Sequence, residues 1–214
     1  MTSRREFLIA SSGLAVAGLA PHWARAAAKD GTDYVVLTPA IATLDPKRIE
    51  VLEFFWYGCP HCFNLEGDLS AWRKTLAKDV YFRRVPASGP PPWVPLAKAY
   101  FAAEALGVTE KLHSDMFNAI HLSGMNLNER ETLFKFVEQY GVNRKSYAAA
   151  YDSAAVQAKV KQAAELGNKA GVDSVPTLIV DGRFRTSPSM TGNSHDKLFV
   201  VVNELISVAR KTKK

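Results

Sequence analysis

The pattern of apolar and polar positions predicts strands and helices in a definite order. Residues 33–38 (DYVVLT) are predicted as a strand. Residues 49–57 (IEVLEFFWY) are apolar over nearly their whole length, which favours a central strand covered on both faces. Residues 62–77 (CFNLEGDLSAWRKTLA) carry apolar side chains at roughly helical spacing, and residues 80–85 (VYFRRV) form the next predicted strand. This strand–helix–strand order predicts a parallel pair with a crossover helix.

A proline-rich segment separates this unit from a helical region. Residues 86–95 (PASGPPPWVP) contain three successive prolines, which can continue neither a strand nor a helix. From about residue 96 to residue 170 the chain has the texture of several helices. Thr109 and Asn128 are predicted to cap two of these helices, and Asn143 to open another.

The last part of the chain returns to strand and ends in a helix. Residues 175–186 (VPTLIVDGRFRT) predict a hairpin with the Asp-Gly pair as its turn. Residues 195–211 predict the final helix, capped by Asn193 or Ser194. The complete order is that of a thioredoxin topology with helices added in its middle. We therefore expect an α/β protein with a thioredoxin-like fold and an inserted helical domain.

The first 26 residues have the layout of an export signal. Arg4 and Arg5 precede an apolar run over residues 7–20, and an Ala-Arg-Ala pattern ends at Ala26. The run is too short for a membrane span, which needs about 20 apolar residues. The stretch SRREFL resembles the twin-arginine export motif, and the alternative is an ordinary secretion signal with two arginines. We expect cleavage near Ala26 and a periplasmic location.

Composition bounds the mature chain. Removal of residues 1–26 takes away three Arg and one Glu, which leaves 188 residues and lowers the net charge from +6 to +4. The remaining Lys and Arg residues are scattered, so we expect no nucleic-acid partner. We expect a soluble monomer in which residues 27–94 and 155–214 form the thioredoxin-like domain and residues 95–154 form the inserted helical domain.

The two cysteines carry the candidate chemistry. Cys59 and Cys62 are the whole cysteine content, and Pro60 and His61 lie between them. A zinc site needs four ligands, but the chain has no second C-x-x-C and its other histidines are scattered. Covalent haem attachment needs His where the chain has Phe63. A purely structural disulfide would close so short a loop that it removes little entropy from the unfolded chain. We therefore expect a redox-active pair, with no metal and no other cofactor.

The position of the pair predicts unequal cysteines. Cys59 lies where a buried strand meets a helix, and free amides at a helix start stabilise a thiolate. His61 adds a positive charge or a hydrogen-bond donor, and Pro60 is well tolerated in a first helical turn. Cys62, one turn further, is the candidate resolving thiol. Because a stable thiolate favours the reduced form, the disulfide form should be an oxidant.

A second motif supports this interpretation. Val175 and Pro176 open the predicted hairpin about 115 residues after the cysteines. In a thioredoxin-like fold such a proline is cis and faces the redox pair, which leaves the backbone of Val175 free to pair with a substrate strand. A proline that merely begins a strand is the alternative.

Three stretches resemble the DsbA family of thiol:disulfide oxidoreductases: VLEFFWYGCPHCFNLE, LAKAYFAAEALGVTEKLHSDMFNAI and GVDSVPTLIVDGRF. They occur in the family's order and span essentially the whole mature chain. The resemblance implies a periplasmic enzyme that donates its disulfide to newly exported polypeptides. It also implies reoxidation by a DsbB-like quinone-linked membrane protein. It makes Cys59 the attacking thiol, Cys62 the resolving thiol and Pro176 the cis-proline.

The resemblance also implies roles for charged residues. Glu53 and Glu66 match the family's acidic residues near the buried cysteine and would relay its proton. Arg84 or Arg83 is the candidate basic partner. A solvated helix glutamate is the alternative for Glu66, whereas a carboxylate in an apolar strand such as Glu53 needs a specific reason to be there.

Some features depart from the family pattern or leave other functions open. The stretch ASGPPPW is unusually rich in proline and could reshape the groove near the redox pair. Trp56 and Trp93 could add apolar surface there, or could be plain packing residues. A disulfide isomerase or reductant is one alternative, although isomerases such as DsbC rely on a dimerisation domain. A redox-inactive peptide-binding chaperone is the other.

Overall fold

The computed structural model describes residues 27–213, so the predicted export signal lies outside the described residues. A five-stranded sheet has the order β1-β5-β4-β2-β3. The parallel pairing of β2 with β3 and the antiparallel hairpin of β4 and β5 confirm the sequence predictions. The strands are β1 (Val35–Val36), β2 (Ile49–Phe55), β3 (Val80–Pro86), β4 (Thr177–Val180) and β5 (Phe184–Thr186).

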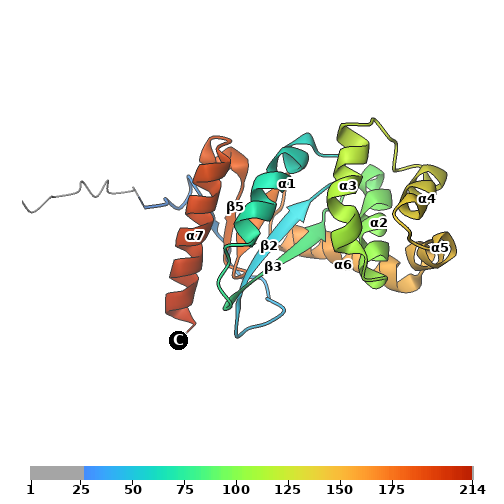
Figure 1. The fold of residues 1–214 in the computed structure, drawn as a ribbon. Coiled ribbons are helices and arrows are strands. Elements are labelled where there is room, and N and C mark those ends of the chain that lie inside the picture. Colours follow the sequence, from blue (N-terminus) through green and yellow to red (C-terminus); the bar gives the residue numbers. More distant parts are fainter. Residues whose placement is uncertain (1–26, 214) are drawn as a thin grey trace, which may run out of the picture.

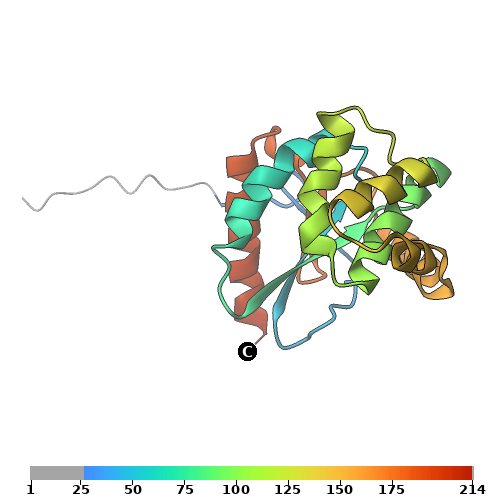
Figure 2. The same cartoon turned by 45° about the vertical axis from the view of Figure 1, so that its right-hand side comes forward.

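Helices surround the sheet on both faces and beyond one edge (Figures 1 and 2). Helices α1 and α7 lie side by side, and α2, α3, α4 and α5 gather beyond the β3 edge. The bounds are α1 (Pro60–Arg73), α2 (Val94–Ala105), α3 (Thr109–His121), α4 (Arg130–Gln139), α5 (Arg144–Asp152), α6 (Ala154–Lys169) and α7 (His195–Thr212), with short 3-10 turns at Pro91–Trp93 and Pro188–Thr191. No helix within the described residues is long and apolar enough to cross a membrane.

The central strand β2 explains the long apolar run in the sequence. All seven of its residues are buried. Val51 packs with the apolar side chains of α1 and α7, whereas Leu52 and Phe54 belong to the cluster formed with α2 to α6. Because both faces are covered, alternation of apolar and polar residues is absent.

The helix caps agree only partly with the sequence. Asn143 and Ser194 cap α5 and α7 through side-chain oxygens that accept backbone N–H bonds. Thr109 is instead the first residue of α3, and Asn128 lies one residue before the cap of α4, so both of these predicted caps are wrong. Asn126 provides the physical reason for α4, because its side chain accepts the N–H of Asn128 and forms a local turn before the helix.

Candidate active site

The two cysteines lie where β2 gives way to α1. Cys59 is the N-cap of α1 with extended backbone (φ −88°, ψ 118°), and Pro60 occupies the first helical position. Its side chain is therefore set against the free amides of the first turn. Both thiols are free, and Cys59 is 8% exposed whereas Cys62 is 1% exposed. Only Cys59 is accessible to an attacking sulfur.

The surroundings separate the acidities of the two thiols. A hydrogen bond from the side chain of Cys62 lowers the pKa of Cys59 to about 6, and backbone N–H groups and the charge of His61 act in the same direction. Burial raises the pKa of Cys62 far above its ordinary value, and contact with Cys59 and the charge of Glu53 raise it further. At neutral pH the reduced pair therefore holds a thiolate at Cys59 and a thiol at Cys62.

The Val175–Pro176 peptide faces Cys59. This peptide bond is cis, as the sequence motif predicts. The carbonyl oxygen of Val175 lies 3.4 Å from Sγ of Cys59, so the backbone that precedes Pro176 borders the exposed sulfur. A cavity of about 110 Å³ adjoins this loop, and Trp93 and Val175 are among its lining residues.

Two stacked tryptophan rings cover the loop that leads to Cys59. The rings of Trp56 and Trp93 are stacked with centroids 4.7 Å apart and planes 9° apart. A methyl group in place of the Gly58 hydrogen would lie 2.4 Å from the Trp56 ring, so only glycine fits under this stack. The proline-rich segment thereby places Trp93 beside the loop that leads to Cys59. The sequence had left open whether the two tryptophans lie there.

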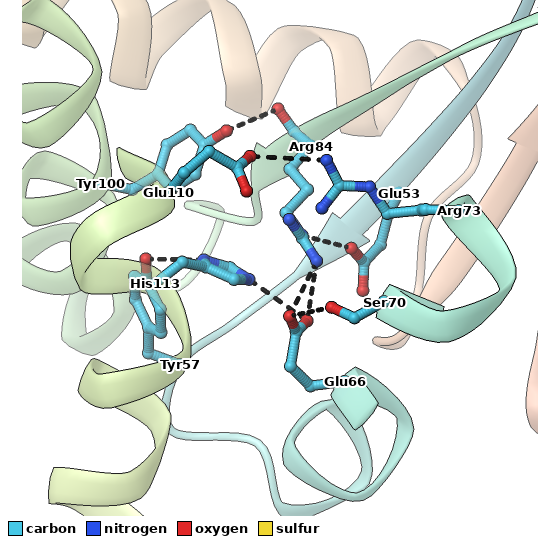
Figure 3. Close-up of polar contacts among 9 residues, drawn as sticks. All are labelled: Glu53, Tyr57, Glu66, Ser70, Arg73, Arg84, Tyr100, Glu110 and His113. Carbon is cyan, nitrogen blue, oxygen red and sulfur yellow. Dashed lines mark hydrogen bonds and ion pairs between the residues drawn. The ribbon is translucent and has the colours of Figure 1, made fainter. Parts of the chain in front are cut away.

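A buried arginine joins the two acidic residues that the sequence singled out (Figure 3). Nε of Arg84 donates to Glu53 at 3.0 Å, and its terminal nitrogen donates to Glu66 at 2.8 Å. Arg84 is therefore the basic partner, whereas Arg83 pairs with Glu50 elsewhere on the same strand pair. The three partners come from β2, α1 and β3.

The two carboxyl groups differ in acidity. Burial raises the pKa of Glu53 to about 7, against the lowering effect of Arg84. Burial acts on Glu66 too, but the hydrogen bond from His113, the charge of that ring when it is protonated and the charge of Arg84 outweigh it and hold the pKa of Glu66 well below its ordinary value. Near neutral pH, Glu66 is therefore ionised while Glu53 exchanges its proton.

Sequence reasoning missed His113 and Tyr57, which complete this network. His113 of α3 contacts Oε2 of Glu66 through Nε2 at 3.3 Å and the hydroxyl of Tyr57 through Nδ1 at 2.9 Å. The signal that could have revealed it is a histidine among the apolar positions of a helix, next to Leu112 and one turn before Met116. No residues between 27 and 213 form a cluster of metal-ligating side chains.

Comparison with known proteins decides the family. A family model described as a DSBA-like thioredoxin domain matches residues 93–200. The thiol:disulfide interchange protein DsbA of Pseudomonas syringae pv. tomato is 37% identical over 97% of each chain. That of Burkholderia cepacia is 38% identical over 87% of each chain. The chain belongs to the DsbA family.

Solved DsbA structures share the fold. The crystal structure of Pseudomonas aeruginosa DsbA has a TM-score of 0.81 at 31% identity, covering 85% of this chain and 94% of that one. Xylella fastidiosa DsbA has a TM-score of 0.80 at 32% identity, covering 86% and 98%. The expected thioredoxin-like α/β fold is thus confirmed, and the chain is a thiol:disulfide oxidoreductase of this family. DsbA proteins use a cysteine disulfide in place of an external cofactor.

Proposed function

We propose that this DsbA-family chain donates the Cys59–Cys62 disulfide to reduced polypeptides as they leave the cytoplasm. The observation that carries the proposal is the unequal pair: the pKa of Cys59 is lowered to about 6 and that of Cys62 is raised by burial. A thiolate stabilised in the reduced form makes the disulfide form easier to reduce. The direction of transfer is therefore from the enzyme to the substrate.

The reaction proceeds in two exchanges. A substrate thiolate attacks Sγ of Cys59, the enzyme disulfide breaks, and Cys62 leaves as a thiolate that takes up a proton. A second substrate thiolate then attacks the substrate sulfur of this mixed disulfide, so the substrate disulfide forms and Cys59 leaves as a thiolate. Two electrons pass from substrate to enzyme. Of the two protons lost by the substrate thiols, one replaces the proton taken by Cys62 and the other goes to solvent.

Glu53 is the proposed proton donor to Cys62. Its charge contributes to the raised pKa of that thiol, and its own pKa of about 7 suits proton exchange near neutral pH. Glu66, which meets Glu53 through Arg84, completes the proposed relay. His61 and Pro60 shape the start of α1 and stabilise the Cys59 thiolate.

Partners and location follow from the same proposal. Val175 and Pro176 would bind the substrate backbone beside Cys59, because the backbone that borders the exposed sulfur can pair with an extended strand. The export signal at residues 1–26 supports a periplasmic location. Reoxidation would come from a DsbB-like quinone-linked membrane oxidase, and the enzyme would act as a monomer. We keep the division into a thioredoxin-like domain (27–94 and 155–214) and an inserted helical domain (95–154) as part of the proposal.

The redox potential tests the direction of transfer. The purified protein is equilibrated with glutathione buffers, and the fraction with the Cys59–Cys62 disulfide is measured by thiol labelling. We expect a value near the roughly −120 mV known for DsbA, since both depend on a stabilised thiolate. A potential near the roughly −270 mV known for thioredoxin would contradict the oxidant and favour the reductant.

Cysteine variants separate catalysis from simple peptide binding. Cys62→Ser should accumulate a mixed disulfide when it is incubated with a disulfide-bonded peptide, because the Cys59 thiolate attacks the peptide disulfide and no resolving thiol releases the product. Cys59→Ser should neither oxidise the peptide nor trap it. Equal activity in the wild type and both variants would support the redox-inactive chaperone instead.

A further inference from the structure

His113 links helix α3 to the charged network of Glu53, Glu66 and Arg84 (Figure 3). It is 3% exposed and lies on α3, opposite Glu66 of α1. Its two ring nitrogens have different partners, Tyr57 at Nδ1 and Glu66 at Nε2. The proposed disulfide transfer gives this residue no role.

Glu66 requires a hydrogen on Nε2 of His113, and burial favours the neutral ring, in which Nδ1 is an acceptor. The carboxylate of Glu66 also accepts from Arg84 and from Ser70, so it can only accept from Nε2, which must carry a hydrogen. Nδ1 is then free to accept the hydroxyl hydrogen of Tyr57. Burial lowers the pKa of His113, which agrees with the neutral ring. Every hydrogen-bonding group of the histidine is thereby satisfied.

The charged groups around His113 bind one proton, which can lie on either of two carboxyl groups. Arg84 carries one positive charge against the two carboxyl groups of Glu53 and Glu66, so one bound proton makes the trio neutral. Arg73 and Glu110 pair with each other at 3.4 Å and cancel. The titratable and charged groups that face the histidine from the packed elements are Tyr57, Glu66, Arg73, Arg84, Tyr100 and, on its own helix, Glu110.

The two carboxyl groups are not equivalent sites for that proton. Glu66 lines a groove of about 480 Å³ between α1 and α3, together with Asn64, Ser70 and Ser114. Its side chain is 10% exposed, whereas that of Glu53 is 3% exposed. Protons from solvent therefore reach Glu66 first, whereas the charge that acts on the Cys62 thiol is that of Glu53.

We propose that His113 is a positioning residue that keeps Glu66 ionised, so that the single proton of the network is held on Glu53 beside Cys62. This inference deepens the proposed function and rests on it. Without the Nε2–H bond, Glu66 loses a donor and holds the proton itself. Glu53 then stays ionised against Arg84, and the proton is held on Glu66 instead of on the carboxyl group whose charge acts on Cys62.

Carbon NMR of isotope-labelled glutamate tests this directly. Reduced wild type, His113→Leu and His113→Gln are titrated, and the two carboxyl signals are assigned with Glu53→Gln and Glu66→Gln. In the wild type the carboxyl that titrates near neutral pH should be Glu53. In His113→Leu it should be Glu66, with the pKa of Glu53 falling by more than about one unit. His113→Gln should restore the wild-type order, since an amide can both donate to Glu66 and accept from Tyr57.

Tyr57→Phe is the matched control, because it removes the other hydrogen bond of the same histidine. It should leave Glu53 as the carboxyl that titrates near neutral pH. The role of His113 is refuted if His113→Leu keeps the wild-type order, or if Tyr57→Phe moves the proton as much. Disulfide transfer to a reduced peptide is assayed on the oxidised form of the same wild-type preparation, in which Cys59 and Cys62 are disulfide-bonded. Absence of transfer there counts against the proposed function, whereas transfer with an unmoved titration counts against His113 alone.

Discussion

At the residue scale, two chemically identical side chains acquire opposite properties within one turn of helix. Cys59 meets the amides that begin α1, whereas Cys62 lies inside the protein with 1% of its surface exposed. The first setting favours an anion and the second disfavours one. The difference makes Cys59 a good leaving group and Cys62 a thiol that must receive a proton.

The acidity of Cys59 is the first prediction at this scale. The thiolate ultraviolet absorbance of the reduced protein should titrate near pH 6, in place of the roughly 8.5 of ordinary cysteine. Cys62→Ala should raise this midpoint because it removes the largest stabilising hydrogen bond, whereas Cys62→Ser keeps a donor and should raise it less. His61→Gln should raise it too, through loss of charge.

The same shift has a consequence for stability. Because the pKa of Cys59 is lower in the folded protein, the unfolded chain binds more protons between pH 6 and about 8.5. Cys59 should therefore contribute more stability to the reduced protein as the pH rises through that window, and this contribution is lost as the pH falls through 6; the raised pKa of Glu53 acts in the opposite direction up to about pH 7, so the effect is measured as the difference from Cys59→Ala. Cys59→Ala, the comparison, lacks this contribution. A titration midpoint near 8.5 in the wild type would contradict both expectations.

At the element scale, α3 is the helix that connects the helices beyond the β3 edge with the residues around Cys59 and Cys62. His113 reaches Glu66 and the hydroxyl of Tyr57, while His121, two turns later, contacts the carbonyl oxygen of Tyr57 at 2.8 Å. Tyr57 is two residues before Cys59, so α3 holds the loop that carries the attacking sulfur. Movement of this helix would therefore shift the loop that carries Cys59.

Helix caps provide a prediction with a matched control. Asn143→Ala should lower the free energy of unfolding by about 1 kcal/mol, because the side chain accepts the N–H of Ser146 at the start of α5. Asn128→Ala should change it by less than about 0.5 kcal/mol, since that exposed side chain caps no helix. Chemical denaturation measures both. Equal losses in the two variants would show that the assigned cap of α5 is not the source of the effect.

At the scale of the whole molecule, Arg84 is a buried cation whose ion pairs connect several elements of the core. It connects β2, β3 and α1 directly and α3 through Glu66 and His113. A buried arginine of this kind is retained because the acids around it are costly without it. Arg84, which balances the charges of the two acids near the redox pair, therefore also holds the sheet and helices together.

Replacement of this arginine gives the prediction at this scale. Arg84→Met should lower the free energy of unfolding by about 3–5 kcal/mol near neutral pH, because two buried carboxylates lose their cation. Their pKa values then rise above those of the unfolded chain, so the loss should grow as the pH increases from about 5 to 8. Denaturation at several pH values measures it.

A neutralised background separates charge from packing in this test. Arg84→Met combined with Glu53→Gln and Glu66→Gln should show a much weaker dependence on pH. If the triple variant loses stability with rising pH as steeply as Arg84→Met does, the buried charges are not the cause.

The sequence by itself determined the order of strands and helices along the chain, the helical region and the identity of the redox pair. These features depend on local patterns: the apolar run before Cys59, the prolines that end elements, and the Asp-Gly turn, whose residues have φ of 54° and 66°. Local spacing is enough because each pattern concerns residues adjacent along the chain. Two caps were misplaced because α3 begins after Val108 and α4 after Glu129, and neither of these cap residues makes a side-chain hydrogen bond that a sequence pattern could reveal.

Only the tertiary structure decided how the charged residues combine. The choice of Arg84 over Arg83 depends on which face of β3 turns inward, and His113 reaches Glu66 from 47 residues away along the chain. The stacking of Trp56 on Trp93 likewise needs the path of the proline-rich segment. Burial and pairing set the acidity of these groups, and both are produced by the packing of distant segments.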